Sequence, residues 1–122
     1  MAGTSVIQHQ GRDIILLDFS GIQDPEVAIP TVAEAGRFVQ SFPADRSALT
    51  CTDVTNTKYD RRVVDACKEL SRGNAPHVKA AAVVTSSSIH RAAINMIGLV
   101  ARRKLMTFET REQALDWLAS QA

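Results

Sequence analysis

The fold is decided by residues 13–19, DIILLDF, in which four large apolar side chains follow one another without a polar break. A strand that is apolar on both faces is typical of a largely parallel sheet covered by helices on each side. Residues 79–85, KAAAVVT, repeat the pattern with smaller side chains, which permit close helix packing. The two stretches predict an α/β domain with residues 13–19 near the centre of its sheet.

Shorter strands complete the expected sheet. Residues 6–8, followed by the turn signal Gln10-Gly11, predict an antiparallel edge strand. Residues 48–53 alternate between apolar and polar, and residues 105–108 form a short last strand. With a helix after every strand except the first, the expected order is β-βα-βα-βα-βα, and each parallel crossover should be right-handed.

Helix starts and ends are marked by residues that suit them. Asp24-Pro25-Glu26 combines an N-cap, a first-turn proline and an acidic residue, which predicts the start of the first helix. Pro30 lacks a backbone donor, so we expect a kink or a restart near Thr31. The last helix is expected to follow a capping box, Thr110-x-x-Gln113.

The second helix is expected to begin at a capping-box-like sequence, Thr57-x-x-Asp60, and to run to about Arg72. Gly73-Asn74 then predicts a left-handed C-cap. This reading places the helix between two polar loops and buries one stripe of it against the sheet.

The third helix is expected to begin after the serines 86–88 and to bury one apolar stripe against the sheet. Ile94 and Leu99 fall outside that stripe, so we expect them to be the surface of a homodimer, if one forms. The residues of the predicted stripe are Ile89, Ala92, Ala93, Met96, Ile97 and Val100.

Length and charge narrow the functional classes. At 122 residues the chain has the usual size of one domain, which we expect to span residues 1–122. The 14 basic and 13 acidic residues are interspersed and the net charge is +1, so no nucleic-acid partner is expected. The basic cluster of Arg102, Arg103 and Lys104 is assigned to a helix end, where cations complement the helix dipole. No apolar run reaches about 20 residues and residues 1–10 lack a signal-peptide pattern, so we expect a cytoplasmic protein without membrane insertion.

The sequence contains no recognisable catalytic motif. Cys51 and Cys67 lack C-x-x-C spacing, which fits a reduced compartment, and Cys67 falls on the buried stripe of the second helix. A cysteine-dependent enzyme would need Cys51 as nucleophile and His77 or His90 as base, yet Cys51 lies inside a strand. His9, near the edge strand, is expected to be solvated. Since no phosphate-binding loop, dinucleotide fingerprint or zinc-ligand spacing occurs, we expect no cofactor and no enzymatic activity, with the cysteine enzyme kept as the least favoured alternative.

Polar residues gather where three of the predicted parallel strands end. Open α/β sheets bind ligands at this edge, because loop donors and helix N-termini converge there. The same hydroxyl groups are what helix starts require, so helix capping and the binding of a small anion or a phosphorylated side chain both stay open. The candidate residues are Ser20, Gly21, Asp53, Thr55, Asn56, Thr57, Ser86, Ser87 and Ser88.

Four segments resemble the small bacterial SpoIIAA-like proteins, which look like STAS domains and are grouped structurally with the CRAL-TRIO lipid carriers. They are residues 14–21 (IILLDFSG), 52–57 (TDVTNT), 77–84 (HVKAAAVV) and 107–118, which begins Thr-Phe and ends Trp-Leu. The resemblance covers nearly the whole chain. It implies a superhelix of β-α units that acts in regulation or signalling through protein contacts.

By analogy with the anti-sigma-factor antagonists, the resemblance also implies a phosphoacceptor at the start of the second helix, here Thr55 or Thr57. The antagonists carry an acid closely followed by serine and glycine, whereas this chain has Asp53, then Thr55 and Thr57 with Asn56 between them. The partner protein would respond to the negative charge that phosphorylation adds.

A small-ligand protein is the alternative function. The CRAL-TRIO relationship implies a lipid-like or other small ligand, and Ile94, Leu99 and Met106 add apolar surface beyond what one sheet face needs. Lipid carriers of that class use extra helices to enclose a cavity. In this chain nearly all of the 122 residues are needed for the core, which argues against a lipid-binding cavity.

Overall fold

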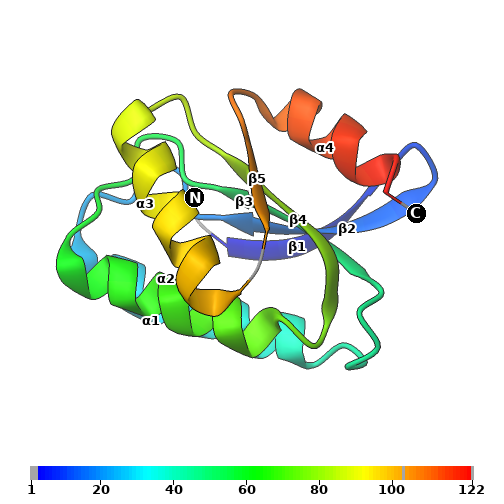
Figure 1. Cartoon of the computed structure of the whole chain (residues 1–122), viewed down its shortest axis with the longest axis horizontal. Helices are drawn as coiled ribbons and strands as arrows, with labels where there is room; N and C mark the ends of the chain where they lie inside the picture. The colour runs from blue at the N-terminus through cyan, green and yellow to red at the C-terminus, as the bar shows by residue number, and fades with distance from the viewer. Residues whose placement is uncertain (1–2, 103, 122) are drawn as a thin grey trace.

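A five-stranded sheet forms the centre of the molecule (Figure 1). The computed structural model describes residues 3–102 and 104–121. The strands lie side by side in sequence order, with β1 and β2 antiparallel and every other neighbouring pair parallel. This architecture confirms the predicted α/β class, including the antiparallel strand at the N-terminal edge. The strands are β1 (Gly3–His9), β2 (Arg12–Asp18), β3 (Ala48–Asp53), β4 (Val78–Val84) and β5 (Leu105–Phe108).

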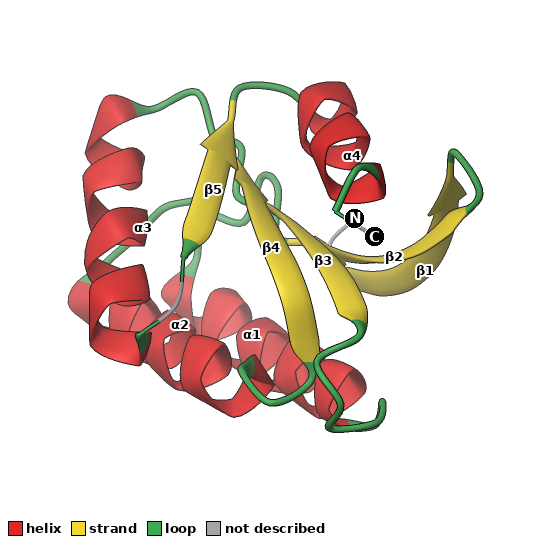
Figure 2. Cartoon of the chain, turned by 45° about the vertical axis from the view of Figure 1, so that its right-hand side comes forward, coloured by secondary structure: helices red, strands yellow, loops and turns green. Residues whose placement is uncertain are grey.

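Helices cover both faces of this sheet. Three of them pack on one face and α4 packs alone on the other (Figure 2). Within the part of the chain that the structure describes, no helix has both the length and the apolar character that a membrane span requires. The helices are α1 (Pro25–Gln40), α2 (Arg61–Asn74), α3 (Ser88–Ala101) and α4 (Arg111–Ala119).

Strand β2 contributes to two separate cores, as its sequence predicts. Ile15 and Leu17 point to the face covered by α1, α2 and α3, whereas Ile14 and Leu16 point to the face covered by α4. All four are buried, and Ile14 is fully so. The doubly apolar run therefore lies in the interior of a mainly parallel sheet.

The hairpin between β1 and β2 turns at Gln10 and Gly11, which both adopt positive φ, 52° and 78°. Two successive left-handed residues suit the tight hairpin turn whose twist matches that of its strands. His9 next to this turn is half-buried and paired. Its Nε2 lies 2.7 Å from Oδ1 of Asp116, which ties the hairpin to α4.

Helix α1 begins as predicted but continues through Pro30. The Asp24 side chain accepts a hydrogen bond from the N–H of Glu26, and Pro25 occupies the first turn. The expected restart near Thr31 is wrong, since one helix spans Pro25–Gln40. Pro30 is exposed, so water can reach the carbonyl that loses its donor there.

Helix α2 begins and ends differently from the prediction. Asp60 is its N-cap and accepts from the N–H of Val63 at 2.9 Å, while Thr57 takes no part in the cap. At the other end Gly73 and Asn74 stay helical and Ala75 is the cap, so the predicted left-handed ending is wrong. Gly73 faces α1, where an added Cβ would meet the flexible end of the Gln40 side chain.

Helix α3 is rotated relative to the predicted stripe. Ile94, Ile97 and Gly98 are the buried residues, and Ile94 is only 2% exposed, so its assignment to an outer surface is wrong. Both sides of this helix are apolar, so periodicity could not choose which one faces the sheet. The large apolar residues on its outer side are Ile89, Met96, Leu99 and Val100, which are 40–80% exposed.

Candidate functional site

The loops at the carboxyl edge of the sheet lie against one another. The N–H of Gly21 donates to the carbonyl of Thr55 at 2.9 Å, which joins the loops after β2 and β3. The N–H of Val54 donates to the carbonyl of Val84 at 3.0 Å, which joins the loop after β3 to the end of β4. Gly21 has a φ of 77°, a conformation that glycine adopts without strain. The predicted gathering of Ser20, Gly21 and the 53–57 loop is thus present.

A charged cluster lies at this edge, on the α4 side of the sheet. Asp18 ends β2 and Asp53 ends β3, and the two are paired in register. Arg111, in the first turn of α4, donates from Nε to Oδ2 of Asp53 at 2.7 Å, and its Nη2 lies 3.1 Å from Oδ2 of Asp18. One guanidinium thereby bridges two neighbouring carboxylates, so the cluster carries a net negative charge.

The environment keeps Asp18 ionised. Burial opposes its charged form, but hydrogen bonds from the hydroxyl and the N–H of Ser20, together with Arg111, outweigh burial and lower the pKa of Asp18. A negative edge repels anions, so the cluster disfavours the anion-binding alternative. Sequence reasoning missed Asp18 and Arg111 as site residues. A signal was present in the sequence: two predicted neighbouring strands each end in an aspartate, Asp18 and Asp53, and both side chains fall on the same face of the sheet.

The two candidate phosphoacceptors occupy different environments. Thr57 is 4% exposed, and its hydroxyl donates to the carbonyl of Phe19 at 2.7 Å. This burial disfavours Thr57 as a phosphoacceptor, because its side chain holds the loop after β3 against the end of β2 and a kinase could not reach it. Thr55 is half-buried, and its N–H donates to Oδ1 of Asp53 at 2.9 Å. Asn56 is exposed, with a φ of 56°.

The serine hydroxyls that form hydrogen bonds are used by the fold itself. Ser20 donates to Oδ1 of Asp18 at 2.5 Å, and Ser87 caps α3 by accepting from the N–H of His90 at 3.3 Å. Ser86 and Ser88 are exposed. These contacts favour the capping interpretation over a preformed ligand site at this edge.

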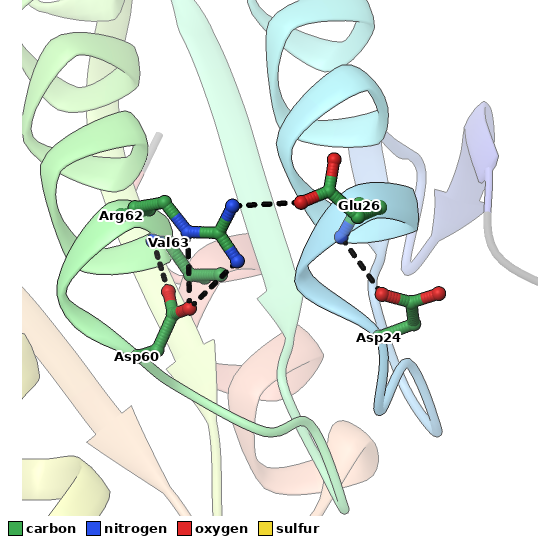
Figure 3. A network of polar contacts seen from close by, with 5 residues as sticks. All are labelled: Asp24, Glu26, Asp60, Arg62 and Val63. Atoms are coloured by element: carbon green, nitrogen blue, oxygen red, sulfur yellow. Dashed lines mark hydrogen bonds and ion pairs between the residues drawn. The ribbon is translucent and has the colours of Figure 1, made fainter.

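A second polar network joins the starts of α1 and α2 (Figure 3). Nη1 of Arg62 lies 2.7 Å from Oε1 of Glu26, and its Nη2 lies 3.2 Å from Oδ2 of Asp60. The carboxylates of Asp24 and Asp60 cap the two helices. Because these charges are paired with one another and with helix N–H groups, the two helix starts offer no free anion site.

The cysteines and histidines do not form a catalytic pair. Cys51 is completely buried, and burial raises the pKa of its thiol to about 12. Burial raises the pKa of Cys67 to about 12 as well. Nδ1 of His77 lies 2.8 Å from the carbonyl of Phe42, and His90 stacks on Tyr59 with ring centroids 4.4 Å apart. Residues 3–102 and 104–121 contain no group of three or more His, Cys, Asp or Glu that could hold a metal.

The outer side of α3 exposes several large apolar side chains. Ile89 and Leu99 are each 80% exposed and Met96 is 57% exposed, so the predicted exposure of Leu99 is confirmed. A groove of about 460 Å³ continues this side toward β5 and is lined by Leu99 and Met106, with Ile94 at its base. We call Ile89, Met96, Leu99 and Val100, together with this groove, the docking face.

Basic residues border the docking face. Arg102 ends α3 in a left-handed conformation and Lys104 lines the groove, while Arg103 of the predicted cluster lies outside the described residues. Helix α3 itself contains no acidic residue, and Arg91 on it pairs with Glu109.

Comparison with known proteins identifies the fold. No family model and no curated protein matches this chain. An uncharacterised protein of the DUF3478 family from Shewanella loihica, which has a SpoIIAA-like fold, superposes with a TM-score of 0.72. The match covers 97% of this chain and 95% of that one at 14% sequence identity. The chain therefore has the SpoIIAA-like fold that its sequence predicts.

Proposed function

We propose that this SpoIIAA-like domain is not an enzyme and acts by binding another protein through the docking face. The observation that carries the proposal is the row of large apolar side chains on the outer side of α3, 40–80% exposed. Contiguous apolar surface of this kind, bordered by polar residues, is typical of protein interaction sites.

The β5 edge of the sheet also supports a protein-binding site next to α3. Strand β5 lies at the end of the strand order and pairs only with β4 in the part of the chain that is described. An unpaired strand edge can form main-chain hydrogen bonds with an extended segment of a partner. Because the groove separates this edge from α3, such a segment would place its side chains between Leu99 and Met106.

The charges around the docking face indicate the chemistry of the partner. Arg102 and Lys104 border it, and α3 contributes no carboxylate. A partner with an apolar patch surrounded by acidic residues is complementary to this arrangement, and its association rate should fall as salt is added.

Photo-crosslinking in the native cells tests this proposal. The variant Leu99→p-benzoylphenylalanine places a crosslinker on the docking face, and Glu112→p-benzoylphenylalanine places the same group on exposed α4 as a control. We expect a discrete protein adduct from position 99 and none from position 112. When Met96→Glu is combined with the crosslinker at position 99, the yield of the adduct should fall by about tenfold, because the interface would then bury a charge.

The mass of the adduct identifies the occupant as a second copy of this chain or as another protein. Equal adduct yields from both positions, or no adduct from position 99, would contradict the proposal.

The non-enzymatic part of the proposal has its own test. Because both thiols have a pKa near 12, iodoacetamide should leave Cys51 and Cys67 unmodified in the native protein at neutral pH and alkylate both after unfolding. Peptide mass spectrometry reads the outcome. Rapid native labelling of Cys51 would favour the cysteine-enzyme alternative.

A further inference from the structure

Strand β1 lies outermost at one edge of the sheet (Figure 2), and in the described part of the chain it pairs only with β2. The open edge of a sheet carries unpaired backbone groups, which monomeric proteins usually protect by a short strand, charged side chains, proline or a bulge. Strand β1 has seven residues against four in β5, its register with β2 is continuous, and it contains no proline, Asp, Glu, Lys or Arg. This edge therefore has none of the usual protections.

The hairpin decides which backbone groups of β1 reach the open edge. The two-residue turn at 10–11 is flanked by His9 and Arg12, and the pair that flanks such a turn exchanges both of its hydrogen bonds. Because bonded and non-bonded pairs alternate along an antiparallel ladder, the backbone groups of Ile7 and Ser5 also bond to β2. The N–H and carbonyl groups of the residues between them point away from β2. These residues are Thr4, Val6 and Gln8.

Two large apolar side chains are exposed on this side of the molecule. Val6 is 45% exposed and Val27 is 52% exposed, and among the described residues they are the exposed large apolar ones outside the docking face. Val6 pairs with Ile15, so its side chain lies on the sheet face that α1 covers. On α1, Ile29 and Gly36 line the groove shared with α2, and helical spacing places Val27 on the side away from α2. Since α1 also contacts β1, Val27 and Val6 both belong to the β1 side of the domain.

We propose that the β1 edge binds a second copy of this chain, with the two β1 strands antiparallel and Val6 opposite Val6 of the other copy. This register places the whole of Gly3–His9 opposite the same segment and sets Thr4 opposite Gln8, so that the outward backbone groups of the two copies meet. No like charges face each other across the pair. Such a two-fold pairing is self-complementary and closes after two copies. The edge has no charge that would select a foreign segment, whereas its own sequence fits it in register.

Hydrogen exchange of the full 122-residue chain tests the strand pairing. Sedimentation velocity first defines the monomeric and dimeric concentrations, and we expect a dimer dissociation constant of about 100 µM or below. In the dimer the N–H groups of Thr4, Val6 and Gln8 should exchange at least about tenfold more slowly than in the monomer. Those of Ser5 and Ile7 should change less, because they already bond to β2. A monomer mass up to about 1 mM, or a dimer in which the first three amides stay unprotected, would overturn the proposal.

Matched valine substitutions locate the interface. Val6→Lys places two ammonium groups beside the two-fold axis and should raise the dissociation constant of the dimer at least about tenfold. Val100→Lys makes the same change at a residue of α3 that is 40% exposed, and it should leave the constant within about twofold. Circular dichroism checks that both variants are folded, and hydrogen exchange of the native chain keeps the test decisive if Val6→Lys does not fold.

Loss of the dimer in Val100→Lys but not in Val6→Lys would place the second copy on the docking face and overturn the proposal. Val6 and Leu99 lie on different elements, so the crosslinking result at position 99 stands or falls separately.

Discussion

Arg111 is the residue on which the polar edge of the sheet depends. Its guanidinium bridges Asp18 and Asp53, whose strands are neighbours, and it also anchors the start of α4. Without it, two adjacent carboxylates would face each other with no cation between them. Sequence analysis did not find this contact, because local patterns do not reveal a pairing between distant segments.

We expect Arg111→Met to lower the free energy of unfolding by about 1–2 kcal/mol at pH 7. This is less than the roughly 3–5 kcal/mol for breaking a fully buried pair, because the Arg111 side chain is 40% exposed. Urea unfolding followed by the fluorescence of Trp117, which packs on Phe108, measures the change. The exposed pair of Arg72 with Glu69 supplies a control, since Arg72→Met should change stability by about 0.5 kcal/mol or less.

The same variant should change the pH dependence of stability. The pKa of Asp18 is lower in the folded state than in the unfolded state, so its ionisation stabilises the fold above that unfolded value and the contribution is lost as the pH falls through the folded one. The difference between the native protein and Arg111→Met should thus be largest at neutral pH and shrink below about pH 4. A difference that stays constant down to acid pH would contradict the electrostatic role of Arg111.

Thr55 and Thr57 form a matched pair for testing the loop after β3. Thr57→Val leaves the Phe19 carbonyl without its donor and should cost about 1–3 kcal/mol, whereas Thr55→Val should change stability by no more than about 0.5 kcal/mol. Because Thr57 is buried and Thr55 is half-buried, Thr55 is the one of the two that remains a candidate phosphoacceptor. Thermal unfolding of both variants checks the difference, and equal losses would contradict the placement of Thr57.

At the scale of elements, the strands were predictable and the faces of the helices were less so. Residues 13–19 and 79–85 are apolar on both sides, a pattern that leaves little choice but a covered, mainly parallel strand. Helix α3 has apolar residues on its inner and outer sides, so its orientation depends on tertiary packing. The start of α2 was ambiguous for a similar reason, since Thr57 and Asp60 are both good caps and the fold uses Thr57 elsewhere.

The orientation of α3 makes a prediction of its own. Ile94→Ala should destabilise the protein by about 2–4 kcal/mol, because Ile94 is buried in the core, and Leu99→Ala should change stability by about 0.5 kcal/mol or less. Chemical denaturation of the two variants measures both values. A larger loss for Leu99→Ala than for Ile94→Ala would mean that the helix presents its other side to the sheet.

At the scale of the whole molecule, the two faces of the sheet differ in packing: one is closed by its core, and the other contains a cavity and a surface groove. The α4 face is closed by a compact core that includes Cys51, Ala114 and Leu118, each fully buried. The opposite face holds the cavity beneath α2 and α3 and the docking face above it. Neither the cavity nor the groove of the docking face could be predicted from sequence, because both arise where separate helices and strands meet.

The central claim is that the outer side of α3 is uncovered in the free domain and available to a partner. The most direct test is solvent paramagnetic relaxation of methyl signals, measured with a soluble gadolinium chelate where light scattering gives the monomer mass. We expect Met96 and Leu99 to relax rapidly while Ile94 and Ile97 stay protected. Protection of Leu99 in the monomer, or relaxation of Ile94 as fast as that of Leu99, would contradict the claim.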